Sequence, residues 1–217
     1  MRKIVCNTFA TLDGVMQGPG GPEEDRANNF KYGGWSVSYW DEAMEQVMGE
    51  FTKPSFDLLL GRKTYEIFAA HWPFVKDDPT ADKFNKATKY VATNTLTSSL
   101  WQNTVFLNND IVQQLRELKK QDGIEIQVHG SSDLLQTLQR HNLVDEFHVW
   151  IFPVVLGQGK RLFEPGSMGS GLQLTDHKVS KSGVIMATYI PKGEIELGSF
   201  ALEKPTELEI ERRKHVQ

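Results

Sequence analysis

The sequence predicts an α/β fold whose mainly parallel sheet is covered by helices on both faces and ends in antiparallel strands. Up to about residue 145, short apolar segments alternate with segments of helical periodicity, as in strand–helix–strand units. The segment Phe56–Gly61 is almost continuously apolar, which is typical of a strand buried on both faces. After residue 145, β-prone segments follow one another without a long helix between them, so we expect antiparallel pairing there.

The first part of the chain supplies a strand, a long loop and two helices. Residues 2–12 are β-prone and predict a strand. A glycine- and proline-rich loop follows over residues 13–35, and a loop of this length is uncommon unless it is functional. Residues 39–52 place apolar side chains on one face and predict a helix with Ser38 as its N-cap. A short helix from Thr64 to Ala70 follows the buried strand.

The remaining elements are short and are separated by turn residues. Asp110 is expected to cap a helix that Gly123 ends, and Lys181-Ser182-Gly183 is typical of a tight hairpin turn. In order, we predict strands at 90–93 and 105–107, the helix after Asp110, a strand at 124–128, a helix at 132–141 and strands at 146–151, 172–180 and 184–191.

The chain of 217 residues predicts one domain over 1–192 and a charged C-terminal extension over 193–217, with a short strand at 195–202. A balance of 24 Lys and Arg against 28 Asp and Glu gives no basic surface, so we expect no nucleic acid partner. The single cysteine, Cys6, suits a reducing compartment. Because no apolar run approaches about 18 residues and no Cys/His cluster is present, we expect a cytoplasmic protein without membrane or metal binding.

Two strand-to-helix junctions are candidates for phosphate binding. In the first, Gly61 lets the backbone approach a ligand, Thr64 can cap the helix, and Arg62 and Lys63 lie beside its positive end. The second is His129-Gly130-Ser131-Ser132, where a buried strand turns into a helix. Two helix starts at the carboxyl edge of one parallel sheet could hold the separate phosphates of a dinucleotide. The G-x-G-x-x-G fingerprint is absent, and such junctions also occur for geometric reasons alone.

Several motifs together resemble one protein family. Gly61-Arg62-Lys63-Thr64-Tyr65-Glu66 resembles a signature of dihydrofolate reductase, and Thr11-Leu12-Asp13-Gly14-Val15 resembles a segment of the reductase domain in bifunctional riboflavin-biosynthesis enzymes. The stretch from His129 to Phe163, with Leu143-Val144-Asp145-Glu146 in its middle, is similar to the C-terminal signature of that domain. The similarity spans roughly residues 2–191, and the segment from Thr11 to Asp25 places the chain with stand-alone proteins of the dihydrofolate reductase family.

This resemblance implies a three-layer fold like that of dihydrofolate reductase, which binds NADPH, commonly as a homodimer. It implies that the loop from Asp13 to Gly34 covers the nicotinamide and the substrate as a lid. His129-Gly130 stands where dihydrofolate reductase usually has two glycines. The implied cofactor-binding residues are Gly61, Arg62, Lys63, Thr64, Thr93, Asn94, His129, Gly130, Ser131, Ser132 and Leu134.

The implied activity is that of an NADPH-dependent oxidoreductase, which transfers a hydride to a C=N or C=O group of a pyrimidine- or pterin-like small molecule. Dihydrofolate reduction and reduction of the ribosylamino-pyrimidine of riboflavin synthesis are both open. The Gly61–Glu66 segment differs from the sugar-phosphate segment of the riboflavin enzymes, which argues against the second option. The substrate-binding helix carboxylate of dihydrofolate reductase has no definite counterpart in the sequence, which argues against the first option. A non-catalytic NADPH-binding or assembly protein that kept the fold is the alternative.

A reductase of this kind also needs a proton donor and a flat binding surface. A carboxylic acid in an apolar pocket can donate the proton, and Asp13, Asp41 and Glu42 are the candidates. Each also has a structural interpretation, because Asp13-Gly14 is a good turn and acids are favoured in the first turn of a helix. Trp35, Trp40 and Tyr65 are candidates for substrate binding, although aromatic residues at helical spacing are often core residues.

Overall fold

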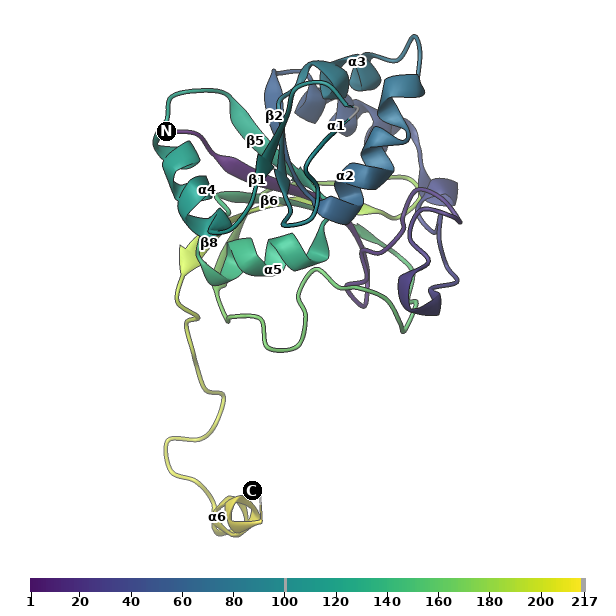
Figure 1. Ribbon diagram of the computed structural model, residues 1–217. Coiled ribbons are helices and arrows are strands. Elements are labelled where there is room, and N and C mark those ends of the chain that lie inside the picture. Colours follow the sequence, from purple (N-terminus) through teal and green to yellow (C-terminus); the bar gives the residue numbers. More distant parts are fainter. Residues whose placement is uncertain (100, 216–217) are drawn as a thin grey trace.

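A mixed sheet of eight strands forms the centre of the computed structural model, which describes residues 1–99 and 101–215 (Figure 1). The strand order is β4-β3-β2-β5-β1-β6-β8-β7. Every pairing from β4 to β6 is parallel, whereas β8 pairs antiparallel with both β6 and β7. The predicted mostly parallel sheet with antiparallel C-terminal strands is therefore confirmed.

The elements follow the predicted alternation closely. The strands are β1 (Ile4–Thr11), β2 (Phe56–Gly61), β3 (Lys89–Ala92), β4 (Thr104–Leu107), β5 (Glu125–His129), β6 (Glu146–Phe152), β7 (Gly171–Val179) and β8 (Ile185–Gly193). The helices are α1 (Glu42–Thr52), α2 (Arg62–Ala69), α3 (Pro79–Lys86), α4 (Ile111–Lys120), α5 (Ser132–Arg140) and α6 (Glu207–Lys214), with 3₁₀ turns at Ala27–Asn29, Val37–Tyr39 and Trp72–Phe74.

Three elements differ from the prediction. Helix α1 begins after Asp41, whose carboxylate accepts a hydrogen bond from the Met44 amide at 3.1 Å, while the predicted N-cap Ser38 lies in a 3₁₀ turn. Helix α3 was not predicted, although Asp78 followed by Pro79 is a recognisable helix start. The strand predicted at 195–202 does not form, and the C-terminal extension instead contains α6.

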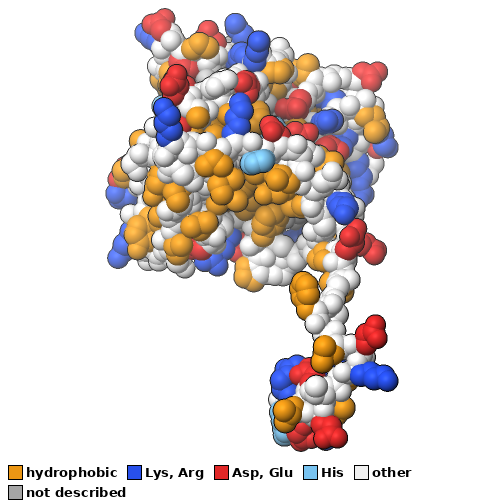
Figure 2. Space-filling model, turned by 180° about the vertical axis from the view of Figure 1, so that it is seen from behind, with side chains coloured by type: hydrophobic (Ala, Val, Ile, Leu, Met, Phe, Trp, Pro, Cys, Tyr) orange, Lys and Arg blue, Asp and Glu red, His pale blue; other side chains and the backbone are white. Residues whose placement is uncertain are grey.

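Helices cover the two faces of the sheet unequally. Helices α4 and α5 pack on one face through fully buried leucines such as Leu115 and Leu138, and α1, α2 and α3 lie over the other face (Figure 1). On the outer strands β7 and β8, several apolar side chains remain exposed, and Figure 2 shows hydrophobic side chains gathered in one band on the back of the molecule. Within the described ranges, every helix is too short or too polar to cross a bilayer.

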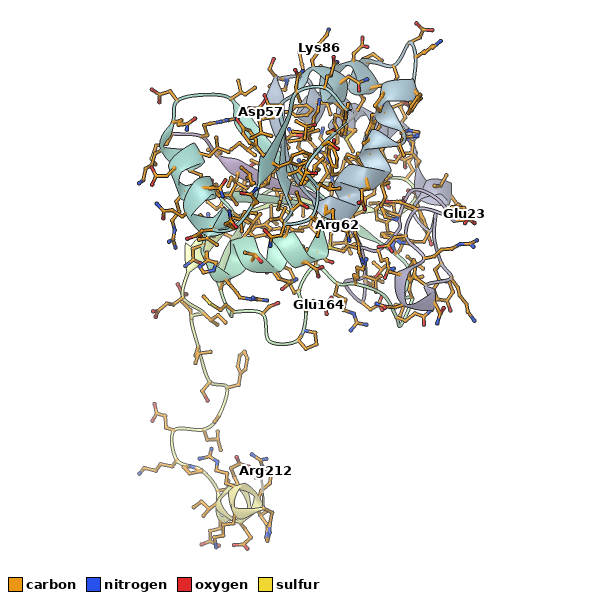
Figure 3. The ribbon with its side chains drawn as sticks, viewed as in Figure 1. Glu23, Asp57, Arg62, Lys86, Glu164 and Arg212 are labelled. Carbon is orange, nitrogen blue, oxygen red and sulfur yellow. The ribbon has the colours of Figure 1, made fainter. Side chains whose placement is uncertain are left out.

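The two ends of β2 show where the amino edge and the carboxyl edge of the parallel strands lie. Figure 3 shows Asp57 near one end of this strand and Arg62 beyond the other, with Arg212 of α6 far from both. Asp57 forms a buried ion pair with Arg2 at the amino edge of the parallel strands. Arg62 begins α2 at the carboxyl edge, where ligands of parallel α/β sheets bind. The carboxyl edge is therefore the place to look for a functional site.

Candidate functional site

A cavity of about 550 Å³ opens at the carboxyl edge of the parallel strands. Its walls come from the middle of β1 and β6, the ends of β2 and β5, the ends of β3 and β4 with the residues that follow them, the starts of α2 and α5, the C-terminal part of α1, and the loop that follows β1. This volume is in the range of small-molecule sites. All of the predicted cofactor residues lie together on its wall, namely Gly61, Arg62, Lys63, Thr64, Thr93, Asn94, His129, Gly130, Ser131, Ser132 and Leu134.

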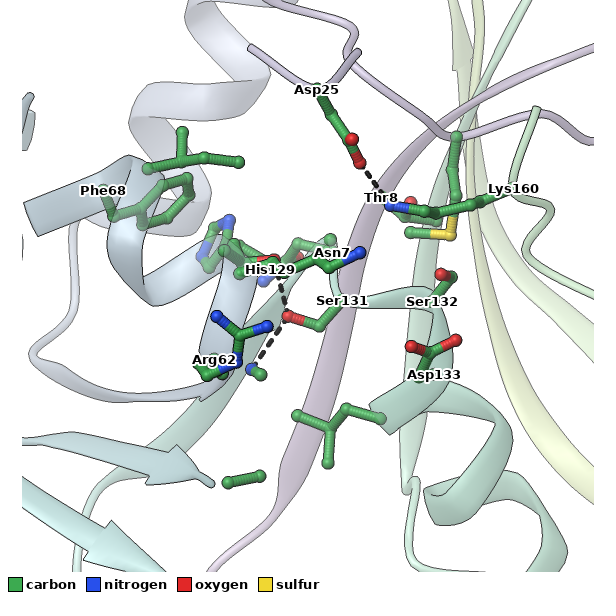
Figure 4. Close-up of a pocket in the computed structure, with 18 of the residues that line it drawn as sticks. Asn7, Thr8, Asp25, Arg62, Phe68, His129, Ser131, Ser132, Asp133 and Lys160 are labelled. Atoms are coloured by element: carbon green, nitrogen blue, oxygen red, sulfur yellow. Dashed lines mark hydrogen bonds and ion pairs between the residues drawn. The ribbon is translucent and has the colours of Figure 1, made fainter. Parts of the chain in front are cut away.

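The Ser131 hydroxyl joins the two strand-to-helix junctions. Its Oγ accepts a hydrogen bond from the Gly61 amide at 2.9 Å and donates one to Thr64 Oγ1 at 2.8 Å (Figure 4). Gly130 and Ser131 both have positive φ, at 62° and 64°, and these hydrogen bonds help to hold Ser131 in a conformation that is uncommon for serine. The two junctions are thus fixed relative to each other by the protein itself.

Charged side chains flank the cavity on opposite sides. Lys63 is exposed in the first turn of α2, and Arg62 beside it pairs with Glu66 at 2.9 Å. Across the cavity, Asp25 of the long loop forms an ion pair with Lys160 (Figure 4). Burial alone would raise the pKa of Asp25, but hydrogen bonds from Lys160 and the Ala27 amide, together with the Lys160 and Lys63 charges, lower it. Asp25 is therefore ionised at neutral pH.

Three polar side chains lie side by side on the cavity floor. The strand register places Asn7 of β1 between His129 of β5 and His148 of β6. His148 contacts Asn7 Oδ1 through Nδ1 at 2.8 Å and Glu146 Oε1 through Nε2 at 2.7 Å, and the Phe51 ring stacks on it at 4.1 Å. Among the described cavity residues, Asn7 alone has a buried side-chain nitrogen without a hydrogen-bond partner. Such an atom calls for a partner that the chain does not provide.

The imidazole of His129 is neutral at physiological pH. Burial, together with the nearby His148, lowers the pKa of His129 to about 4. Its Nε2 lies 3.0 Å from Gln127 Oε1, which can accept the Nε2 proton of a neutral ring. The bulk of this side chain packs near Phe68 and Phe84, so the residue combines a place on the cavity wall with a place in the core.

The acids predicted as proton donors lie outside the cavity wall. Asp13 accepts hydrogen bonds from Thr11 Oγ1 at 2.6 Å and from the Leu156 and Gly157 amides at 3.2 and 2.8 Å, and so ties the end of β1 to a distant loop. Asp41 caps α1 and also accepts a bond from the Ser182 amide at 3.2 Å. Glu42 is exposed on α1. These positions give the three carboxylates structural or solvent contacts, and we do not propose them as proton donors.

We expect Asp13→Asn to make the free energy of unfolding depend less on pH in the acidic range. Burial would raise the pKa of Asp13, but its hydrogen bonds from Thr11, Gly157 and Leu156 lower it from 3.8 to about 2. The stability that the carboxylate adds is therefore present above its unfolded-state pKa and is lost as the pH falls from about 4 to about 2. Urea unfolding across this range should show a steeper loss for the wild type than for the variant. Asp122→Asn, at an exposed carboxylate, is the control, and parallel curves for Asp13→Asn and the wild type would contradict the assignment.

The predicted substrate aromatics belong to the packing around the cavity. Trp35 is buried and donates its Nε1 proton to the Gln17 carbonyl at 2.8 Å, and Trp40 stacks on Trp150 at 5.8 Å. Tyr65 is buried in the core, with its hydroxyl 3.3 Å from Thr104 Oγ1. None of the three lines the cavity wall. The apolar side chains that do so are Phe9, Met16, Met48, Phe51, Ile67, Phe68, Leu107, Ile111, Leu134 and Trp150.

Three acids that the sequence analysis did not single out line the cavity, namely Glu24, Asp25 and Asp133. Glu24 lies half-buried in the long loop after β1, with Oε2 accepting the Gly20 and Gly21 amide protons at 2.5 and 3.2 Å. Burial, followed by the charge of Asp25, raises the pKa of Glu24, and the two amide hydrogen bonds offset only part of this effect. The sequence could have pointed to these residues, because Glu24 and Asp25 are adjacent acids in the predicted lid, and acids in a loop that covers a site can face that site.

These features define a class of α/β protein in which a twisted parallel sheet holds a small molecule at its carboxyl edge between two helix starts. The chain belongs to the family of RibD C-terminal domains, a reductase-like family whose model matches residues 2–186. Two relatives come from Bacillus subtilis strain 168, and both are uncharacterised. YyaP is 29% identical over 195 residues, covering 87% of this chain and 94% of YyaP. YwjB is 31% identical over 177 residues, covering 82% and 91%.

Solved structures with low sequence identity share the fold. A Shewanella sp. PV-4 protein named for riboflavin biosynthesis has a TM-score of 0.62 at 18% identity, covering 88% of this chain and 99% of that chain. A pyrimidine reductase-like protein of Corynebacterium diphtheriae has a TM-score of 0.58 at 13% identity, with coverage of 88% and 92%. Enterococcus faecalis dihydrofolate reductase, complexed with NADP(H) and RAB-propyl, has a TM-score of 0.55 at 14% identity, with coverage of 88% and 96%. The predicted fold family is therefore confirmed.

Proposed function

We propose that this protein is an NADPH-dependent reductase of a flat, pyrimidine- or pterin-like heterocycle. The observation that carries the proposal is the pair of helix starts joined by Ser131 on the wall of one cavity. The fold shared with a dihydrofolate reductase complexed with NADP(H) supports it. Membership of a reductase-like family supports the reaction class.

The donor groups on the wall suit a phosphorylated dinucleotide. The backbone N–H groups at the starts of α2 and α5, with the hydroxyls of Thr64 and Ser132, would hold the diphosphate. Lys63 and Arg62 would pair with the 2′-phosphate, which requires Arg62 to exchange its contact with Glu66. Asp133 in the first turn of α5 also lines the cavity, so its carboxylate must face away from the phosphates.

The substrate would lie over the cavity floor. Phe51, Phe68 and Trp150 offer aromatic surface there, and the unpaired Asn7 Nδ2 offers a hydrogen-bond donor to a ring carbonyl or nitrogen. NADPH, when bound, supplies the hydride. Glu24, whose raised pKa keeps it protonated further toward neutral pH than an ordinary glutamate, would give the proton, directly or through a water molecule.

Both predicted substrates, dihydrofolate and the ribosylamino-pyrimidine of riboflavin synthesis, are heterocycles of this kind. A non-catalytic NADPH-binding protein that kept the fold is the second candidate function. Oxidation of NADPH, followed by absorbance across a panel of pterins and pyrimidines, separates these candidates: binding without oxidation of NADPH by any compound favours the second. The homodimer and the cytoplasmic location remain predictions.

We expect NADPH to stabilise the protein more than NADH does. At a concentration of 100 times its dissociation constant, a ligand adds about 2.7 kcal/mol to the free energy of unfolding. Replacing Arg62 and Lys63 together by alanine should weaken NADPH binding by about tenfold or more, since each charge-assisted contact contributes about 1.5–3 kcal/mol, and should change NADH binding little. Both affinities can be measured by titrating nucleotide fluorescence.

A matched pair of exposed lysines provides the control for this test. Lys76 and Lys86 lie outside the cavity wall, so their double replacement by alanine removes the same charge without touching the site. Equal losses of NADPH and NADH affinity in the Arg62 and Lys63 variant would contradict the assignment of the 2′-phosphate. The absence of stabilisation by either nucleotide would rule out the cofactor.

A further inference from the structure

One face of the two outer strands has the pattern of a buried surface and yet is exposed. In β7, Leu174 is aligned with Tyr189 of β8, whose β6 neighbour Phe147 is buried in the cluster under α5, and Leu172 lies on the same face. Val179 is aligned with Ile185, whose β6 neighbour Ile151 packs against the same cluster. The other face of β7 carries polar side chains, including Lys178. Alternation of this kind is typical of a strand with one face covered. However, Val179 is 61% exposed and Leu174 is 47% exposed.

We call the exposed residues Leu172, Leu174, Val179 and Ile185 the β7–β8 patch. The register places Val179 directly beside Ile185, so the patch is continuous across both strands. Strand β7 is also the last strand of the sheet, and its outer edge has backbone groups free to pair. A patch of this kind on an edge strand is a surface that native proteins normally cover.

The chain carries a second set of exposed apolar side chains in its C-terminal arm, which we define as residues 194–214. They are Ile195, Leu197, Phe200, Leu202, Leu208 and Ile210. Leu197 is 92% exposed and Phe200 is fully exposed. Helix α6 has only 8 residues, and a helix of that length is not stable in water without a packing partner. The arm therefore has the composition of a segment that packs against another surface.

The start of the arm is fixed to its own body and directs the rest of it away. The Ile195 side chain lies so close to Gly169 that a Cβ atom there would come within 2.8 Å of it, and Lys192 pairs with Glu196 at 3.1 Å. From this anchor the arm runs clear of the sheet, and α6 stands apart from the body (Figure 1). Its charges are paired within α6, with Glu209 at 2.6 and 2.9 Å from Arg212 and Arg213.

From these observations we infer that the C-terminal arm of one copy packs on the β7–β8 patch of a second copy, and that the two copies exchange arms. A two-fold exchange pairs each arm with the opposite patch and leaves no open contact for a third copy. It covers both sets of exposed apolar side chains at once. The arm lies beyond the residues that the family model matches, so the contact is a property of this extension. It does not depend on the proposed reductase function.

The test is the mass of the full chain in solution, measured by light scattering after gel filtration. The wild type should elute with twice the mass of a single 24.6 kDa chain. An arm variant, Leu197→Asp with Phe200→Asp, and a patch variant, Val179→Asp with Ile185→Asp, should each elute with half the wild-type mass. Mixed together at higher concentration, the two variants should form a heterodimer, because the patch variant keeps its arm and the arm variant keeps its patch.

Each other outcome overturns a part of the inference. A monomeric wild type would show that no second copy is bound. A dimeric arm variant would show that the sheets meet without the arms, and failure of the mixture to associate would show that the arm of one copy does not bind the patch of another. Gln173→Asp, on the opposite face of β7, is the matched control and should remain dimeric. Thermal unfolding checks that the patch variant folds. If the patch variant does not fold, the arm variant still tests the inference, because its altered side chains are exposed and should not affect folding.

Discussion

Replacing Glu24 by glutamine is expected to lower kcat for NADPH-dependent reduction by about 10²- to 10⁴-fold, the usual contribution of a general acid. Glutamine keeps the shape of the side chain but has no acidic proton to give. The NADPH affinity should stay within about twofold of the wild type, because Glu24 lies on the loop after β1 and not at the two helix starts. The rate is measured with the best substrate from the pterin and pyrimidine panel.

The role of Glu24 as an acid also predicts how kcat/KM depends on pH. An acid must be protonated to act, so kcat/KM of the wild type should fall as the pH rises through the pKa of Glu24, which burial raises above its ordinary value. Glu24→Gln should lack this alkaline fall and remain uniformly slow. The negative charge of Asp25 is one cause of the raised pKa of Glu24. Asp25→Asn removes this charge, so kcat/KM should fall at a lower pH than in the wild type.

Glu23 is the matched control for Glu24, because it is the preceding residue, is exposed and pairs with Arg26. Glu23→Gln should leave both kcat and the pH profile unchanged. If Glu24→Gln retained the wild-type rate, or lost it only as much as Glu23→Gln does, another group would have to supply the proton. Loss of NADPH affinity in parallel with kcat would instead indicate that the variant disturbs the loop.

Arg2→Ala is expected to destabilise the fold by about 3–5 kcal/mol, the usual result of leaving one member of a buried ion pair without its partner. The guanidinium pairs with Asp57 and donates from Nε to the Ile124 carbonyl at 2.7 Å, and both side chains of the pair are largely buried. The contact joins the start of the chain to β2 and to the residue before β5. Urea unfolding, followed by circular dichroism, measures the loss.

The neighbouring Lys3 provides the control, because its side chain is exposed and lies 3.7 Å from Glu146. Lys3→Ala should change the free energy of unfolding by less than about 1 kcal/mol. Combining Arg2→Met with Asp57→Asn should recover part of the loss, since asparagine keeps an acceptor for the Thr88 amide, 3.0 Å away, without a buried charge. Equal effects of Arg2→Ala and Lys3→Ala would show that the pair adds little stability.

Local patterns in the sequence were sufficient for the sheet and for the part of the cavity wall that the two strand-to-helix junctions form. Buried strands such as Phe56–Gly61 and helix starts such as Ser132 are encoded by neighbouring residues, and the parallel arrangement then places their ends at one edge. Helix α3 was missed because its apolar face is short, and only its start, Asp78 with Pro79, has a clear local signal.

The roles of the acids depended on residues far away in the sequence. Asp13 is held by the amides of Leu156 and Gly157, and Asp41 by that of Ser182, and no local pattern reports such partners. Glu24, in contrast, reaches the cavity because the long loop folds back over the sheet edge. The protonation of a carboxyl group follows from what surrounds it in space, so spacing along the chain could not rank these candidates.

The hydrogen bonds of Ser131 have a consequence for how relatives of this protein can diverge. They set the spacing of the two helix starts through Gly61 and Thr64, whereas Arg62 and Lys63 lie in the first turn of α2 without taking part in that spacing. Under the proposed function, substitutions at these two positions are expected to alter which nucleotide is preferred at little risk to the scaffold. The proposed nucleotide preference and the stability of the fold would then depend on different residues, and related proteins could differ in the first while sharing the second.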